Sequence, residues 1–269
     1  MKVLIFGSKG WLGGCLADEL KKRGHEISGS GEDINNIVSI DGDFDVVVNC
    51  AASTNVDWCE KNKEEAYKNN VLGAVNLAKV CGQAGPGRAG KNYVFVSTLC
   101  IFNSKNKEDI KYEDSIPEPL NFYSQTKAEA EKLIREINPG ALIIRIHFPL
   151  SKIPHPKNAI TKILSYDRAV DVRESVTVVE DALPIIIDLM EKKEKGIFHL
   201  VNEGTISAAE IAELFQHPFV RISGKEREEM LVKSGKARRP VVYAGSRRIP
   251  PLPDIRERIN DLVKNYLTV

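Results

Sequence analysis

The chain has 269 residues, of which 42% are hydrophobic and 28% are charged, and its formal net charge is +1. These are ordinary values for a globular protein with one large domain, or a main domain and a smaller lobe. The balanced charge gives no indication of nucleic-acid or anionic-membrane binding, and no apolar run approaches the roughly 20 residues that a membrane helix needs.

A glycine-rich turn between a strand and a helix opens the chain. Residues 2–6 are apolar and predict a buried strand, and a G-x-x-G-x-x-G pattern then leads into an amphipathic helix over 11–23. Glycines at this spacing let the backbone approach a pyrophosphate at the helix N-terminus. The alternative is a tight strand–helix turn with no ligand. We expect a dinucleotide site formed by the residues of this turn: Gly7, Lys9, Gly10, Trp11, Leu12 and Gly13.

The end of the second predicted strand, residues 25–29, bears on the choice between NAD and NADP. An NAD site usually has an acidic residue here, roughly 20 residues after the glycines, to bind the ribose hydroxyls. The sequence has Ser30 at this point and no carboxylate to repel a 2′-phosphate, which Lys9 could attract. We therefore expect NADP(H) to be preferred and NAD(H) to be possible. If the strand runs longer, Glu32 would lie at its end and would favour NAD(H) instead. Asp33 is a candidate cofactor contact, and the alternative is that it caps a helix or turn.

Small residues follow the third predicted strand, residues 45–49. Ala51 and Ala52 would let a cofactor lie close to the backbone, and Asn70, on a helix expected over 59–81, is a further candidate contact. A flexible glycine-rich loop at 85–90 precedes the next strand.

Residues 93–102 predict a buried strand that ends in a hydroxyl followed by a thiol. If the chain stays extended, Thr98 and Cys100 point to the same face. In a parallel sheet, ligands bind just beyond the carboxyl ends of the strands. The alternative is that Cys100 is a small buried apolar residue, as free cysteines usually are.

Tyr123 and Lys127 are four residues apart at the start of a charged helix over about 122–137, so they share a face. A lysine ammonium beside a phenol lowers the pKa of the phenol, and such a tyrosine can transfer a proton near neutral pH. The spacing alone is common by chance. Behind a dinucleotide pattern it predicts a reductase site.

The second half of the chain offers fewer candidates. A strand over 141–146 is followed by His147, which we interpret as a hydrogen-bonded structural residue rather than a catalyst. Lys162 lies on a helix expected over 158–166. The alternative to a functional role is that it is a solvated surface lysine. The basic stretch 225–239 is interpreted as a solvated face or a lid near phosphates. The remaining predicted elements are an extended segment, a helix, a strand and two further helices: 170–179, 180–191, 196–201, 207–215 and 253–266.

Together these elements predict an α/β fold, a Rossmann-like doubly wound parallel sheet with a smaller C-terminal lobe. Residues 1–148 would form the NADP(H)-binding domain, with 172–201 returning to it, and residues 149–269 the substrate lobe. The five cysteines lack C-x-x-C spacing, and the chain begins directly with a strand rather than a signal peptide. We therefore expect reduced thiols, no metal site and a cytoplasmic protein.

The motifs resemble the extended short-chain dehydrogenase/reductase superfamily, and within it the dTDP-4-dehydrorhamnose reductase branch. The chain is more similar still to the bifunctional nucleotide-sugar 3,5-epimerase/4-reductases of UDP-rhamnose synthesis. The resemblance covers roughly residues 3–216 and then fades. It is carried by short matching segments: residues 10–14, 55–60, 100–102, 122–127, 160–166 and 196–200.

This resemblance implies roles for single residues. Tyr123 would protonate the sugar O4, Lys127 would bind the cofactor ribose, and Thr98 would hydrogen-bond the same oxygen as Tyr123. Cys100 and Lys162 match the pair that performs epimerisation. Thr98, Cys100 and Asn158 are expected to contact the substrate, a UDP or dTDP sugar.

Leu99-Cys100 stands where the reductase branch has an acidic–aromatic pair, which argues against a pure dTDP-type reductase. Leu99 and Phe148 are bulkier than is typical of the bifunctional family. Two alternatives stay open: a reductase without epimerase activity, and a non-catalytic regulatory subunit of the same fold. The resemblance also suggests a homodimer formed through helices 60–81 and 122–137.

Overall fold

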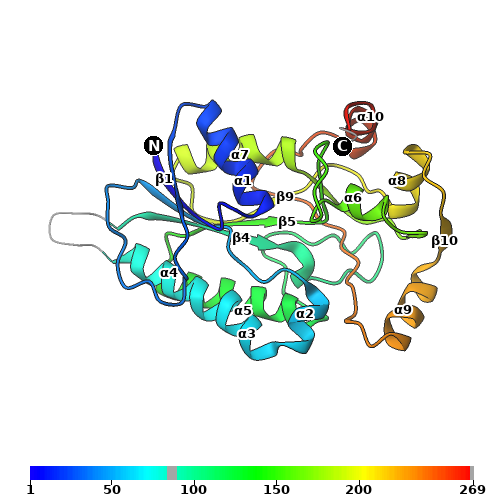
Figure 1. The fold of residues 1–269 in the computed structure, drawn as a ribbon, viewed down its shortest axis with the longest axis horizontal. Coiled ribbons are helices and arrows are strands. Elements are labelled where there is room, and N and C mark those ends of the chain that lie inside the picture. Colours follow the sequence, from blue (N-terminus) through cyan, green and yellow to red (C-terminus); the bar gives the residue numbers. More distant parts are fainter. Residues whose placement is uncertain (84–89, 267–269) are drawn as a thin grey trace.

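The fold is a parallel sheet covered by helices on both faces (Figure 1). The computed structural model describes residues 1–83 and 90–266, so most of the glycine-rich loop expected at 85–90 lies outside the described residues. All five strand pairings of the six-stranded sheet are parallel. Its strands, in spatial order, are β2 (Glu26–Ser30), β1 (Lys2–Phe6), β3 (Val46–Asn49), β4 (Asn92–Thr98), β5 (Leu142–Ile146) and β9 (Gly196–Leu200).

The central strands are apolar on both faces because helices cover both. Every residue of β3 is buried, as expected of a strand inside a parallel sheet. One core lies under α1 (Trp11–Lys22) and α7 (Val179–Glu191), and the other under α4 (Gly73–Gly82) and α5 (Phe122–Ile137). This arrangement confirms the predicted fold class. The strand order reverses at β1, whose neighbours are β2 and β3, and ligands bind at such a switch point.

The single helix expected over 59–81 is divided into several pieces. It consists of α2 (Val56–Lys61), α3 (Lys63–Tyr67), a π-helical turn (Lys68–Leu72) and α4. At the first break Asn62 leaves the helical conformation, with φ −124° and ψ 59°, and its backbone N–H and side-chain amide both donate to the Trp58 carbonyl at 2.9 Å. The π-helical turn contains Asn70. Such turns occur frequently at functional sites.

The strand expected over 93–102 ends at Thr98. A 3₁₀ turn follows (Leu99–Ile101), and the Thr98 hydroxyl oxygen accepts a hydrogen bond from the Cys100 N–H at 3.1 Å. The expectation that Thr98 and Cys100 project from one extended strand is therefore wrong. The capping hydroxyl turns the chain, and the two side chains meet across a turn instead.

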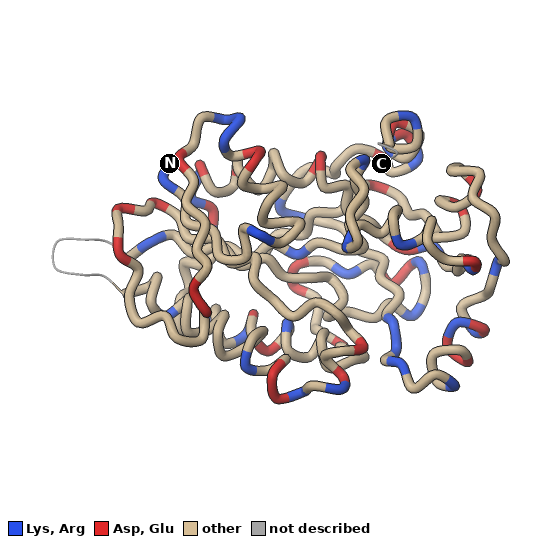
Figure 2. Tube along the Cα trace, viewed as in Figure 1, with Lys and Arg blue, Asp and Glu red and all other residues tan. Residues whose placement is uncertain are grey.

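The C-terminal part has its own apolar core, formed by residues such as Leu150, Ile160 and Ile211. The helix expected over 158–166 is shorter, since α6 spans Ala159–Ile163. No helix in the described ranges is long and apolar enough to cross a membrane. Charges of both signs are interspersed along the chain (Figure 2). The other elements here are β6 (Pro149–Leu150), β7 (Arg168–Val170), β8 (Thr177–Val178), α8 (Ala208–Leu214), β10 (Val220–Ile222), α9 (Gly224–Lys233) and α10 (Ile255–Asn265).

Candidate active site

The glycine turn after β1 has the close packing that a dinucleotide cradle requires. Gly7 has φ +81°, and a Cβ on it would lie 2.7 Å from the Ala51 backbone nitrogen. A Cβ on Gly13 would lie 2.3 Å from the Gly7 carbonyl oxygen, so α1 could not begin this close to β1 with any other residue. The turn, the end of β3 and the N-terminus of α1 therefore meet without side chains between them. These residues fit a bound pyrophosphate.

Trp11, the first residue of α1, joins the glycine turn to the C-terminal part of the chain. Its indole stacks on the imidazole of His155 with ring centroids 5.4 Å apart and an interplanar angle of 7°. The side chain is buried, and its Nε1–H has no hydrogen-bond partner within the described part of the chain. His155 precedes α6, the helix that carries Lys162.

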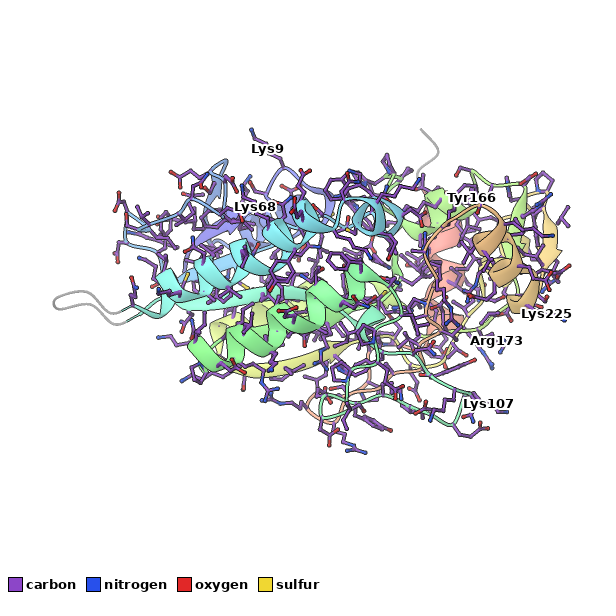
Figure 3. All side chains as sticks on the ribbon, turned by 90° about the horizontal axis from the view of Figure 1, so that it is seen from below. Lys9, Lys68, Lys107, Tyr166, Arg173 and Lys225 are labelled. Carbon is purple, nitrogen blue, oxygen red and sulfur yellow. The ribbon has the colours of Figure 1, made fainter. Side chains whose placement is uncertain are left out.

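The end of β2 carries no carboxylate, as the sequence indicated. β2 ends at Ser30, whose hydroxyl oxygen accepts a hydrogen bond from the Glu32 N–H at 3.2 Å. Asp33 caps a turn, since its Oδ1 accepts from the backbone N–H and the side-chain amide of Asn35 at 3.0 and 2.7 Å. These hydrogen bonds hold the pKa of Asp33 below its usual range. Lys9 is exposed and labelled in Figure 3.

The side chain of Asn70, expected to contact the cofactor, makes its hydrogen bonds within the protein. Its Oδ1 accepts from the Ser53 N–H at 2.7 Å, and its amide donates to the Ser53 carbonyl at 3.0 Å and to Thr126 Oγ1 at 3.1 Å. Both amide protons are used, and the side chain is buried. Asn70 therefore ties the loop after β3 to α5 and has no donor left for a ligand.

Lys127 and Tyr123 project from the first two turns of α5, which is capped by Asn121. Lys127 is 2% exposed, and its Nζ donates to the Val96 carbonyl at 2.9 Å and lies 3.8 Å from the centre of the Phe95 ring. Burial lowers the pKa of Lys127 to about 7, although nearby Glu131 opposes the shift.

The pKa of Tyr123 is raised, contrary to the sequence-based expectation that Lys127 would lower it. Burial is the main cause, and Cys100 and Cys59 add to it, while contact with Thr98 acts in the opposite direction. The Lys127 ammonium is bound to the Val96 carbonyl instead. Tyr123 is therefore a neutral phenol and a proton donor.

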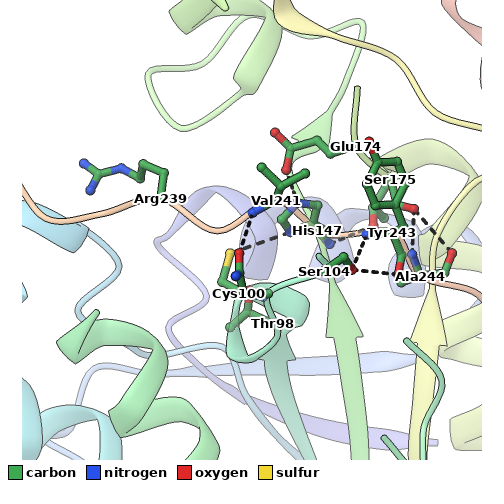
Figure 4. Close-up of polar contacts among 12 residues, drawn as sticks. Thr98, Cys100, Ser104, His147, Glu174, Ser175, Arg239, Val241, Tyr243 and Ala244 are labelled. Atoms are coloured by element: carbon green, nitrogen blue, oxygen red, sulfur yellow. Dashed lines mark hydrogen bonds and ion pairs between the residues drawn. The ribbon is translucent and has the colours of Figure 1, made fainter. Parts of the chain in front are cut away.

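Cys100 lies against a histidine–glutamate pair (Figure 4). Its Sγ is 3.6 Å from His147 Nδ1, and His147 Nε2 is 2.5 Å from Glu174 Oε2. Burial alone would raise the pKa of Cys100, but His147 and a hydrogen bond with Thr98 lower it below the usual value. Burial lowers the pKa of His147, but Cys100 and Glu174 raise it by more, so that it reaches about 10. His147 is hydrogen-bonded, as expected, but no sequence pattern indicated its contact with the thiol.

Lys162 lies on α6, and its pKa is lowered by burial and by the charges of Lys157 and Arg239. Asn158, expected to contact the substrate, instead caps this helix. Its Oδ1 accepts from the Ile160 N–H at 3.0 Å, and its amide donates to the Ser151 and Ile153 carbonyls at 2.7 and 2.9 Å. Because the amide is completely buried and both its protons are used, Asn158 positions α6 and has no amide proton left for a ligand.

Sequence reasoning missed a segment that crosses the site, residues 237–245, which we call the strap. Its carbonyls at Val241, Val242 and Tyr243 each accept a backbone N–H at 2.8 Å, from Ser104, Ser175 and Lys111. Arg239 on the strap donates to Asp57 Oδ2 at 2.8 Å. Only its first residues, 237–239, fall within the basic stretch that was interpreted as a lid or a solvated face, and the whole strap lies beyond the end of the family resemblance. The Arg238-Arg239-Pro240 run was its only sequence signal.

Comparison with known proteins gives a consistent assignment. The family model described as the RmlD substrate binding domain matches residues 1–240. A bifunctional dTDP-4-dehydrorhamnose 3,5-epimerase/dTDP-4-dehydrorhamnose reductase of Arabidopsis thaliana is 34% identical over 229 residues, which cover 79% of this chain and 74% of that protein. A trifunctional UDP-glucose 4,6-dehydratase/3,5-epimerase/reductase of the same plant is 35% identical over 233 residues, 80% of this chain, and this chain spans only 34% of its length.

Solved structures agree with this assignment. The L780 UDP-rhamnose synthase of Acanthamoeba polyphaga mimivirus superposes with a TM-score of 0.87 at 25% identity, covering 98% of this chain and 99% of that one. Other solved structures of this fold contain NADP, NADPH or NAD. The family match spans well over half of the sequence and agrees with the glycine turn, the Tyr123/Lys127 pair and the sheet order. The chain belongs to the RmlD substrate-binding-domain family.

Proposed function

We propose that this chain is an NADP(H)-dependent enzyme that epimerises a 4-keto-6-deoxy nucleotide sugar at C3 and C5 and then reduces its C4 ketone, giving a nucleotide-L-rhamnose. The reductase half follows from the family and its nucleotide-sugar reductases. The observation that carries the epimerase half is the Cys100 thiol beside Thr98 and Tyr123 at the end of β4.

The cofactor would lie along the glycine turn and the small residues that follow β3. Gly7, Gly10 and Gly13 would leave room for its pyrophosphate, with Ala51 packed against Gly7 and Ala52 next in the sequence. Lys9 would attract a 2′-phosphate because the end of β2 carries no carboxylate. When bound, NADPH supplies the hydride that reduces C4.

In the reduction, Tyr123 acts as the general acid. Its phenol is neutral over the physiological range and so holds the proton that O4 needs as the ketone becomes an alcohol. Thr98 donates its hydroxyl proton to the same oxygen. Lys127 would bind the cofactor ribose with the Nζ protons that its hydrogen bond to Val96 leaves free.

In the epimerisation, the C4 ketone acidifies the hydrogens on C3 and C5. A base must remove each proton and an acid must return one to the opposite face. Thr98 and Tyr123 would stabilise the enolate oxygen, as an oxyanion hole does. Cys100 and Lys162 are the proposed base and acid, so one pocket serves both reactions.

The test is proton exchange in D₂O with UDP- and dTDP-4-keto-6-deoxyglucose, followed by NMR, with and without NADPH. We expect deuterium at C3 and C5 without NADPH, and a rhamnose product with it. Cys100→Ala should abolish the exchange, and exchange that persists in this variant would refute the role of Cys100. Reduction of pre-epimerised substrate without any exchange would establish a reductase only. Absence of both activities would favour the regulatory-subunit alternative.

A further inference from the structure

The contact between Cys100, His147 and Glu174 has no role in the function proposed so far. The three side chains come from separate parts of the chain: the turn after β4, the residue after β5, and the segment between β7 and β8. They form a continuous line from the thiol to the carboxylate, at 3.6 Å from Cys100 Sγ to His147 Nδ1 and 2.5 Å from His147 Nε2 to Glu174 Oε2. His147 is 4% exposed.

The backbone of His147 is fixed from both sides. Its N–H donates to Thr177 Oγ1 at 3.0 Å, and its carbonyl accepts the Thr177 N–H at 2.7 Å. Phe148, directly after it, has φ 39°, in the left-handed region that a bulky residue rarely adopts. Such a conformation persists only where the surroundings determine it, and it is concentrated at functional sites. The position of the imidazole is therefore closely constrained.

Glu174 is held as firmly. Its backbone N–H and carbonyl both pair with Ile206, each at 3.2 Å, so the backbone that carries this carboxylate is anchored to the C-terminal core. A carboxylate accepts only, so Nε2 carries the proton of this hydrogen bond. Nδ1 then faces the sulfur, either as acceptor from a thiol or as donor to a thiolate. A nucleophile or base oriented by an imidazole that a third group holds in place is a recurring catalytic arrangement.

We propose that His147 and Glu174 are positioning residues that hold Cys100 as a thiolate, paired with an imidazolium, and so make it the base of the epimerisation. This inference rests on the proposed function. The lowered pKa of Cys100 and the raised pKa of His147 have the directions that such a pair requires.

The proton balance is simple. The thiolate takes the proton from the sugar carbon and becomes a thiol, and the electron pair of the broken C–H bond moves to O4 as an enolate. The Lys162 ammonium returns a proton to the opposite face of the carbon and becomes an amine, while O4 regains its double bond. Transfer of one proton from thiol to amine through solvent restores both groups, and the imidazolium keeps its protons throughout.

Other titratable groups near this line are few. Tyr123 faces the thiol from α5, Tyr243 approaches Glu174 from the strap, and Arg239 lies on the same strap. Both tyrosine pKa values are raised, so neither competes as an anion. His147 is thus the group placed to compensate the charge of the thiolate.

The test measures the thiol directly, without substrate. The rate of iodoacetamide alkylation at Cys100, followed by peptide mass spectrometry to separate it from the other four cysteines, is recorded against pH for the wild type, His147→Gln and Glu174→Gln. We expect the wild-type midpoint well below the roughly 8.5 of a free thiol. His147→Gln should raise the midpoint by about one pH unit or more, and Glu174→Gln by less.

A matched control is the pair His25–Glu191, 2.9 Å apart, because His25 directly precedes β2 and so lies at the amino ends of the parallel strands, whereas this site lies at their carboxyl ends. His25→Gln should leave the alkylation profile of Cys100 unchanged. In His147→Gln, deuterium exchange at neutral pH should fall about tenfold or more and recover at alkaline pH, whereas keto reduction is retained. A merely structural role for His147 would not give this recovery.

An unshifted wild-type profile, or a profile that His147→Gln and Glu174→Gln leave unchanged, would overturn the inference. The wild-type measurement decides even if the His147 variant does not fold. Failure here is distinguishable from failure of the proposed function, because alkylation needs no epimerase activity. If Cys100→Ala abolishes exchange while the alkylation profile is that of a free thiol, the function stands and the thiolate pair is wrong.

Discussion

The ammonium of Lys127 donates its hydrogen bond to the carbonyl of Val96, 2.9 Å away, rather than to the phenol of Tyr123. Burial lowers the pKa of this lysine to about 7 from an ordinary 10.5. Between pH 7 and about 10 the unfolded chain therefore binds one more proton than the folded chain. The free energy of unfolding should therefore rise with pH in this window. Below pH 7 the buried lysine is charged in the folded state, and the full cost of burying that charge is present.

We predict that Lys127→Met raises the free energy of unfolding by about 2 kcal/mol at pH 6, because it removes a buried charge. The gain should disappear as the pH approaches about 10. Reductase activity should nevertheless be lost. Urea titrations at several pH values test this, and a gain that does not depend on pH would contradict the assigned pKa.

Tyr123→Phe should separate the two proposed activities. Removing the general acid should slow keto reduction by about 10²-fold or more. Deuterium exchange at C3 and C5 should fall much less, because Thr98 still binds the enolate oxygen. Single-turnover reduction with NADPH and NMR exchange without it give the two rates. Equal losses in both would mean that Tyr123 is needed for the proton exchange itself.

Lys9→Ala tests the preference for NADP(H). We expect KM for NADPH to rise about fivefold, from the loss of one exposed ion pair worth on the order of 1 kcal/mol. KM for NADH should not change, and the effect should shrink at high salt. Lys107→Ala, an equally exposed lysine labelled in Figure 3, is the control. A parallel rise for both cofactors would place Lys9 away from the 2′-phosphate.

The strap depends on Asp57. Its carboxylate accepts from the Ala237 N–H at 3.0 Å and from Arg239 at 2.8 Å, and although burial opposes it, Arg239 lowers the pKa of Asp57. A carboxyl group whose pKa is lowered by folding stabilises the fold at pH values above its pKa in the unfolded chain, which is near 4. This contribution is lost as the pH falls below that value. Asp57→Asn should therefore cost about 1 kcal/mol at pH 7 and almost nothing at about pH 3.

Asp114→Asn is the matched control, since the ion pair of Asp114 with Arg247 is largely exposed, at 74% and 62%. It should change the free energy of unfolding by less than about 0.5 kcal/mol. If Asp57→Asn weakens nucleotide-sugar binding as well, the strap contributes to that site. Equal, small effects in both variants would show that the strap is held by its backbone hydrogen bonds alone.

Local patterns were enough to predict the sheet and the cofactor cradle. The apolar runs of β1 and β3 and the glycine spacing each act within a few residues, and both features are present. The predicted bounds that were wrong, of one strand and two helices, depend on side chains that hydrogen-bond to the backbone. Thr98 turns the chain after β4, Asn62 interrupts a helix, and Asn158 caps α6. The sequence also could not show that the amide protons of Asn70 and Asn158, both expected to contact ligands, are used within the protein.

The line of Cys100, His147 and Glu174 could not be predicted from the sequence for another reason. The contacts join residues 47 and 27 positions apart, and no local pattern links them. The strap was missed because it lies where the family resemblance fades. In each case the position follows only from the complete packing of the C-terminal core against the sheet.

The stacking of Trp11 on His155 connects the expected cofactor site to the expected substrate site. One ring belongs to the turn that would receive the dinucleotide, and the other leads into the helix that carries Lys162. If each ligand orders the ring that it contacts, binding of one ligand changes the affinity for the other by the same factor in both directions. An enzyme built this way would bind its cofactor and its nucleotide sugar with coupled affinities.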